Sequence, residues 1–256
     1  MIPIRNSIGY ILAKERGWKS LIKGGSGSGN FGHEGRPGEV GGSGEGINTN
    51  KTAFERVSSI LGNQLHITEE TSEIVKKHIE DLSMFPENIL KILKDKGVSF
   101  YIGDKSIVDL DDNKDLKGKL PRGWPAGSSW DSVGGCYRHS LKSVNAGSWR
   151  RSGSVSAIGH ETGHAIFTNI IEAENDFAKI KKLEDLHEKY YPSFTKYYQQ
   201  DGIGGNVGVR EMFAESVAHA LKEKKLLLKS KPFYVINSNK EFASEVTNLI
   251  KKWGIV

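Results

Sequence analysis

The sequence contains a single cysteine, Cys136, so no disulfide bond can form within the chain. A chain without disulfides is typical of a reducing compartment. The sequence also lacks any apolar run near the ~20 residues that a membrane-spanning helix needs. The apolar stretch at residues 8–13 is shorter than most signal-peptide cores, and no small-x-small cleavage site follows it. We therefore expect a protein that is cytoplasmic at synthesis, with no signal peptide and no transmembrane segment.

The main body of the chain has little excess charge of either sign. The formal net charge is +5, but most of it lies in residues 1–23. This segment holds one acidic side chain, Glu15, and several basic ones: Arg5, Lys14, Arg16, Lys19 and Lys23. Nucleic-acid enzymes usually carry their positive charge on the folded domain. We therefore expect no nucleic-acid partner.

Apolar residues are nearly absent from residues 24–46, which consist largely of glycine, serine and glutamate. Such a segment cannot offset the entropy cost of ordering. We predict a flexible linker here, between a basic arm at residues 1–23 and a domain that covers residues 47–256. Apolar side chains recur near helical spacing in the arm, at Ile8, Ile11, Leu12, Trp18 and Ile22. This pattern fits a docking helix for a partner, and it fits equally a tail with no partner of its own.

The domain shows regular hydrophobic patterns. Helical periodicity predicts N-terminal helices over residues 53–61, 74–82 and 86–96, with Thr68 as a candidate cap for the second. Strand patterns follow at residues 98–102, 106–110, 134–138 and 140–146. Further helical segments are expected over residues 155–171, 172–198, 209–221 and 238–253. Helices, then a small mixed sheet, then helices describe an α+β domain.

Two histidines four residues apart occur in the run His160-Glu161-Thr162-Gly163-His164. Four residues make about one helical turn, so both imidazoles share a face and can bind one zinc ion. Glu161 projects beside that face, where its carboxylate reaches a water on the metal without binding the metal itself. Gly163 costs a helix interior roughly 1 kcal/mol, which indicates that another element packs closely there. The motif also fits an ordinary pair of helix histidines, so it needs a third ligand.

The third ligand should come from a second helix. Acidic residues within residues 172–188 lie in a charged, amphipathic stretch, where acids usually form a solvated face. Glu211 and Glu215 lie instead in an apolar run with few other charges, where burying two unpaired carboxylates would be costly. We assign Glu211 to the zinc ion, and Glu215 to the other ring nitrogen of a ligand histidine. The alternative is two exposed acids on an amphipathic helix.

The sequence HETGH at residues 160–164, with EMFAES at residues 211–216, resembles the zinc helices of the gluzincin metallopeptidases, in particular the family of the anthrax lethal factor catalytic domain. The likeness covers residues 95–256 and supports Glu211 over Glu215 as the ligand. It implies a zincin-like fold, Zn²⁺ as the cofactor, and zinc-dependent endopeptidase activity on a protein or peptide substrate with Glu161 as general base. We expect the substrate to extend along an edge strand, either residues 134–138 or residues 140–146.

Members of this family carry a tyrosine a few residues before the ligand glutamate, where its hydroxyl stabilises the oxyanion. This chain has a glycine-rich loop, residues 202–208, at the matching place. Tyr197 and Tyr198 reach the site only if this loop folds back, and His219 lies two turns beyond Glu211. The sequence therefore does not decide whether Tyr197, Tyr198, His219 or none of these residues stabilises the oxyanion.

Residues 27–44 resemble a glycine-rich segment of phage head-associated proteins. This resemblance implies a phage origin, and an N-terminal arm that docks on a phage head or a delivery partner. Two destinations follow for a peptidase: association with a virion, or delivery to another cell as a toxin or effector. The alternative from another functional class is a phage-associated structural or binding module with a zincin fold and little or no proteolysis.

Overall fold

The computed structural model describes residues 52–121, 126–148, 154–224 and 240–256. These residues belong to one compact unit, which covers residues 48–256. The expected basic arm and glycine-rich linker lie outside the described residues, so the domain boundary at residue 47 stays a prediction. No helix in the described part of the chain is long and apolar enough to cross a membrane.

Three short helices open the described part of the chain: α1 (Ala53–Leu61), α2 (Glu73–Leu82) and α3 (Glu87–Asp95). A capping box starts α1, because Glu55 N–H donates to Thr52 Oγ1 while Thr52 N–H donates to Glu55 Oε2. The three N-terminal helices predicted from periodicity are confirmed. Thr68 was a wrong candidate for the α2 cap. Ser72 is the N-cap residue of α2, and Thr68 N–H instead donates to Ile102 O.

A four-stranded mixed sheet follows the order β1-β2-β4-β3. Its strands are β1 (Leu65–Ile67), β2 (Ser99–Ile102), β3 (Gly135–Arg138) and β4 (Ser143–Ala146). β1, β2 and β4 run parallel, whereas β3 runs antiparallel to β4, with Gly135 opposite Ala146 and Arg138 opposite Ser143. β3 is therefore an edge strand, while β4 lies inside the sheet. The small mixed sheet is confirmed.

The strand predicted over residues 106–110 is wrong. Residues Ile107–Asp109 form a 3-10 turn, in which Asp109 N–H donates to Ser106 O and Leu110 N–H donates to Ile107 O. The apolar side chains here are buried without alternation, since Ile107, Val108 and Leu110 all pack into one small cluster with Cys136. Local hydrogen bonds and this shared burial replace strand pairing.

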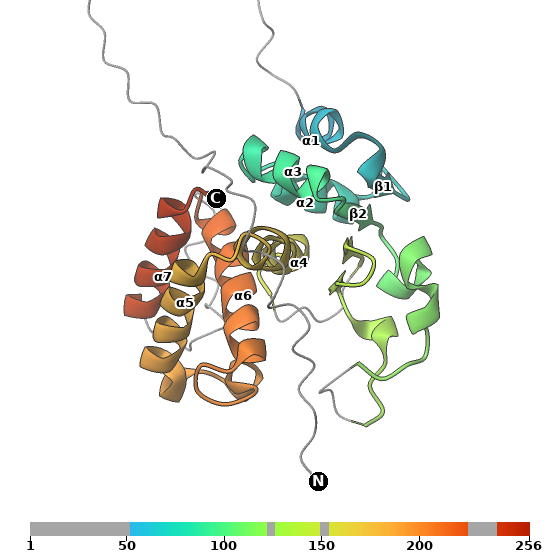
Figure 1. The fold of residues 1–256 in the computed structure, drawn as a ribbon. Coiled ribbons are helices and arrows are strands. Elements are labelled where there is room, and N and C mark those ends of the chain that lie inside the picture. Colours follow the sequence, from blue (N-terminus) through green and yellow to red (C-terminus); the bar gives the residue numbers. More distant parts are fainter. Residues whose placement is uncertain (1–51, 122–125, 149–153, 225–239) are drawn as a thin grey trace, which may run out of the picture. The chain divides into compact units, whose positions relative to one another are not determined.

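The second half of the domain is helical. It contains α4 (Ala157–Ile166), a π-helical turn (Phe167–Glu172), α5 (Phe177–Tyr190), α6 (Asn206–Lys224) and α7 (Lys240–Lys252). The helical segment predicted over residues 172–198 is divided, because 3-10 turns at Tyr191–Ser193 and Lys196–Gln199 follow α5. α5, α6 and α7 lie side by side in Figure 1, in orange to red, and α6 also packs against α4.

One large hydrophobic core joins the N-terminal helices, the sheet and the C-terminal helices. It includes Leu82, Phe100, Ile158, Phe213 and Phe242, all of them fully buried. α4 contacts β3 and β4 on one side and α6 on another, so the histidine-bearing helix lies inside the domain. The predicted α+β class, with helices before and after a small sheet, is confirmed.

Candidate metal centre

The two helices that carry the predicted ligands, α4 and α6, pack directly against each other. Ser156 caps α4, with its Oγ accepting a hydrogen bond of 3.1 Å from Gly159 N–H. Further along α4, a Cβ added at Gly163 would lie 2.8 Å from Ala214 Cα and 3.1 Å from Ala214 O on α6. No side chain fits between the helices at this turn. The close packing expected from Gly163 is confirmed.

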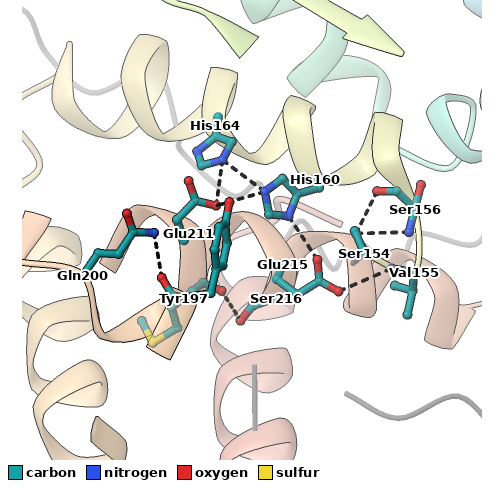
Figure 2. Close-up of polar contacts among 11 residues, drawn as sticks. Ser154, Val155, Ser156, His160, His164, Tyr197, Gln200, Glu211, Glu215 and Ser216 are labelled. Atoms are coloured by element: carbon teal, nitrogen blue, oxygen red, sulfur yellow. Dashed lines mark hydrogen bonds and ion pairs between the residues drawn. The ribbon is translucent and has the colours of Figure 1, made fainter. Parts of the chain in front are cut away.

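Three donor atoms from these helices converge on one point (Figure 2). His160 Nε2 lies 3.1 Å from His164 Nε2 and 3.2 Å from Glu211 Oε2, and His164 Nε2 lies 3.4 Å from Glu211 Oε2. Within the ranges that the structure describes, no other group of His, Cys, Asp or Glu side chains is arranged to hold a metal ion. The structure thus brings together the three residues that the sequence suggested as ligands.

The spacing of these atoms fits zinc. Zinc bonds of about 2.0–2.1 Å in tetrahedral geometry place neighbouring ligand atoms about 3.3–3.4 Å apart. The observed separations of 3.1, 3.2 and 3.4 Å are close to these ligand–ligand distances. Two imidazole nitrogens and a carboxylate oxygen are also donors that zinc prefers.

The electrostatics of the three side chains favour positive charge between them. Burial alone would lower the pKa of His160, but hydrogen bonds to Glu211 and Glu215 hold this pKa well above its ordinary value. Burial alone would raise the pKa of Glu211, but His164 and His160 hold it well below the ordinary value. A proton or a metal cation satisfies the same three atoms, so zinc binding here should displace a proton.

Glu215 lies behind His160 rather than among the converging atoms. Its side chain is fully buried on α6. His160 Nδ1 donates to Glu215 Oε2 over 3.0 Å, and Val155 N–H donates to Glu215 Oε1 over 3.4 Å (Figure 2). Because Nδ1 carries the hydrogen, the neutral ring presents its Nε2 lone pair to the metal position. Two exposed acids, the alternative for this helix, do not match the burial of Glu215 or the 16% side-chain exposure of Glu211.

Glu161 is buried between the histidines and the edge strand. A Cβ added at Gly135 on β3 would lie 2.9 Å from Glu161 Cγ, so the strand passes directly beside this side chain. Burial raises the pKa of Glu161, whereas His160 and His164 lower it. A hydrogen bond with the backbone of Tyr137 also lowers it. The carboxylate is thus outside the set of converging donors but next to it, as a proton acceptor would be.

The glycine-rich loop before α6 does fold back towards the site. Asp201, Gly202 and Gly204 have φ angles of 61°, 84° and 66°, a left-handed backbone that glycine adopts easily. The turn before the loop places Tyr197 beside α6, where its hydroxyl donates to Glu211 Oε2 over 3.0 Å (Figure 2). Burial, together with Glu211, raises the pKa of Tyr197, so the phenol keeps its proton.

The other two candidates for this role are placed differently. Tyr198 packs into the hydrophobic core. His219 lies two turns beyond Glu211 on α6, outside the group of converging donors. Of the three residues left open by the sequence, Tyr197 therefore fits the role best, because its hydroxyl contacts the predicted ligand Glu211.

Two residues near the site were not singled out in the sequence. Gly135 has no side chain and so leaves room for Glu161 beside the edge strand. The two consecutive glycines, Gly134 and Gly135, were the sequence feature that could have indicated this close contact. His187, on α5, contacts the turn that carries Tyr197. No helical or strand periodicity could have pointed to it, because its hydrogen-bond partners, Tyr198 and Gly204, lie in the turn and the loop that follow α5.

Comparisons with known proteins agree with this architecture. The sequence matches the family described as "Anthrax toxin lethal factor, N- and C-terminal domain" over residues 55–247. The structure is similar to that of the Pro-Pro endopeptidase PPEP-2 from Paenibacillus alvei, with a TM-score of 0.52 and 21% sequence identity. This similarity covers 74% of this chain and 99% of that chain, and it shows a shared, zincin-like fold. No curated protein matches the sequence.

Proposed function

Because the chain belongs to the family of the anthrax toxin lethal factor N- and C-terminal domain, we propose that it is a zinc-dependent endopeptidase. The matched region, residues 55–247, includes both helices of the candidate metal centre. The observation that supports the proposal best is the convergence of His160 Nε2, His164 Nε2 and Glu211 Oε2 at 3.1–3.4 Å from one another.

Each side chain has a role in this proposal. His160, His164 and Glu211 hold Zn²⁺, and Glu215 orients His160 through its Nδ1–H. The ion, when bound, supplies Lewis acidity that activates water and polarises the peptide carbonyl. Glu161 accepts the proton of the attacking water and delivers it to the leaving nitrogen.

The oxyanion is stabilised by Tyr197 in this scheme. Its hydroxyl is already directed at the metal centre, 3.0 Å from Glu211 Oε2. A tyrosine hydroxyl keeps its proton at neutral pH, and the raised pKa of Tyr197 strengthens this, so the hydroxyl is a hydrogen-bond donor. A donor fixed beside the reacting carbonyl stabilises charge that develops only in the transition state.

The substrate binds as an extended peptide along β3. Of the two strands considered from the sequence, β4 is paired on both sides, by β2 and β3, whereas β3 has one neighbouring strand among the described residues. An extended peptide can therefore add to the free edge of β3 through backbone hydrogen bonds. Gly135 of this strand lies against Glu161, so a peptide paired there passes the general base. Backbone pairing favours modest sequence preference.

The variant Glu161→Gln tests the proposal. Glutamine keeps the shape of the side chain but cannot accept the proton, so kcat on a cleavable peptide should fall at least about 10²–10⁴-fold. Zinc content should stay near one ion per chain, because Glu161 is not among the converging donors. Glu188→Gln, an exposed site on α5, is the matched control and should leave both quantities unchanged.

Near wild-type cleavage by zinc-loaded Glu161→Gln would contradict the mechanism and favour the alternative of a binding module with little or no proteolysis. Absence of cleavage by the wild-type protein across a mixed peptide library would do the same.

The origin and destination of the protein are proposed from the N-terminal residues. The glycine-rich segment at residues 27–44 supports a phage origin, and the basic arm at residues 1–23 supports docking on a phage head or delivery partner. We propose synthesis in the cytoplasm, followed by association with a virion or delivery to another cell as a toxin or effector. Mass spectrometry of purified particles from producing cells would test this: absence of the chain from the particles counts against virion association.

A further inference from the structure

One buried histidine, His187, is hydrogen-bonded both to the turn that carries Tyr197 and to the glycine loop that follows it. At its other end the turn is paired with Tyr191, whose carbonyl accepts a hydrogen bond of 2.9 Å from Gln199 Nε2–H. His187 lies on α5 and is fully buried. Gly204 N–H donates to His187 Nδ1 over 3.1 Å, and His187 Nε2 lies 2.7 Å from Tyr198 O. Because Nδ1 accepts a hydrogen bond from a backbone N–H, Nε2 carries the ring hydrogen and donates to Tyr198 O. A single ring thus holds both the turn and the glycine loop that follows it.

The ring itself is fixed by its surroundings. It packs against Tyr191 and Phe194, with ring centroids 5.5 Å and 5.1 Å apart. A Cβ added at Gly208, in the first turns of α6, would lie 2.7 Å from His187 Nε2 and 2.6 Å from Tyr198 O. The imidazole therefore cannot move towards α6. Burial also lowers the pKa of His187, which favours the neutral ring that both hydrogen bonds need.

Tyr197 depends on its backbone for its position. The residue as a whole is 46% exposed, and its ring packs against the ring of Tyr198 in the same turn, with centroids 5.1 Å apart. Its hydroxyl nevertheless reaches Glu211 Oε2. The neighbouring residue, Tyr198, is held at its carbonyl by His187, and Gln200 Nε2–H donates to Tyr197 O over 2.7 Å. The position of the Tyr197 hydroxyl therefore depends on the position of the turn that carries the residue.

We propose that His187 is a positioning residue that acts through Tyr197: by bonding the turn at Tyr198 O and the loop at Gly204 N–H, it holds the Tyr197 hydroxyl at the metal centre. The inference rests on the proposed function, in which Tyr197 stabilises the oxyanion. His187 contacts none of the predicted zinc ligands, so its effect belongs to the catalytic step and not to metal binding.

Two conservative variants separate the two hydrogen bonds. The amide nitrogen of glutamine lies near the place of Nε2, so His187→Gln keeps the donor to Tyr198 O. The amide oxygen of asparagine lies near the place of Nδ1, so His187→Asn keeps the acceptor for Gly204 N–H and loses the bond to the turn. We expect kcat to fall about 10–100-fold in His187→Asn, since a misplacement of ~1 Å can cost about 10²-fold. His187→Gln should stay closer to the wild type.

A double-mutant cycle with Tyr197→Phe decides whether His187 acts through Tyr197. Tyr197→Phe alone should lower kcat about 10²–10³-fold, as for the loss of one oxyanion donor. Adding His187→Asn to Tyr197→Phe should then change kcat by less than about threefold. An equal loss in both backgrounds would show a general structural role and overturn the proposal, as would an unchanged kcat in His187→Asn.

Hydrogen exchange gives a second readout that needs no substrate. Amides of residues 196–205 should exchange faster in His187→Asn than in the wild type, whereas amides of α4 should be unchanged. Unaltered exchange at residues 196–205 would overturn the proposal even if the wild-type protein cleaves peptides. Conversely, a wild-type protein that cleaves no peptide would contradict the proposed function. The exchange data would still decide whether His187 holds the turn.

Discussion

Replacing Gly163 with alanine tests how tightly the metal centre depends on the contact between α4 and α6. The added Cβ would lie 2.8 Å from Ala214 Cα, and this neighbour is a backbone atom that cannot rotate away. Carbon atoms in ordinary contact lie about 3.5–4.0 Å apart, so the helices would have to separate by about 0.7–1.2 Å. Glu211 lies about one turn before Ala214 on α6, so its carboxylate would move away from His160 and His164.

The expected magnitudes follow from this separation. Overpacking typically destabilises by about 1–3 kcal/mol, and the better helix propensity of alanine returns up to about 1 kcal/mol. We therefore expect the free energy of unfolding of the metal-free protein to fall by about 0–3 kcal/mol. Zinc affinity should fall about 10–100-fold, as it does when support for a ligand is lost. Urea unfolding measures the first quantity, and competition with a chelator of known affinity measures the second.

Gly159→Ala is the matched control, one turn earlier on the same helix. The atoms nearest to its Cβ would be side-chain atoms and not backbone atoms of α6, with Leu221 Cδ1 at 3.0 Å and Ser156 Oγ at 3.0 Å. Zinc affinity should stay close to that of the wild type. If Gly163→Ala binds zinc as tightly as the wild type and gains the full stability expected from propensity, the inferred contact does not constrain the site.

Three further predictions concern residues around the centre. Glu215→Gln removes the charge behind His160 Nδ1 and should weaken zinc affinity about 10–100-fold by chelator competition; unchanged affinity would mean that His160 needs no such partner. Gly135→Ala places a Cβ 2.9 Å from Glu161 Cγ, so kcat should fall while zinc content stays constant; loss of zinc instead would contradict this assignment. Burial raises the pKa of the Cys136 thiol, so at pH 8 a disulfide reagent should label the native protein far more slowly than the urea-unfolded chain, and equal rates would argue against a buried thiol.

The helices were the most predictable part of the fold. α1 and α3 carry apolar residues at helical spacing over their whole length. A periodic pattern of this length predicts a helix in most tertiary surroundings. Short strands carry no such pattern. β1, with three residues, went unnoticed, and residues 106–110 were mistaken for a strand because consecutive apolar residues can be buried by a turn as well as by a sheet.

The sequence by itself determined the pair His160 and His164, because both lie within one turn of one helix and their relation is local. It also predicted that a third ligand comes from the helix that carries Glu211 and Glu215, since carboxylates in an apolar run need a partner. The sequence also predicted that Glu211 and Glu215 have different roles, and the structure places them accordingly. Tertiary structure alone decided that β3, and not β4, is the edge strand, and that Tyr197 approaches the site. These relations join segments that are distant in the chain, through the packing of α4 on α6 and the path of the glycine loop, and no local periodicity encodes them.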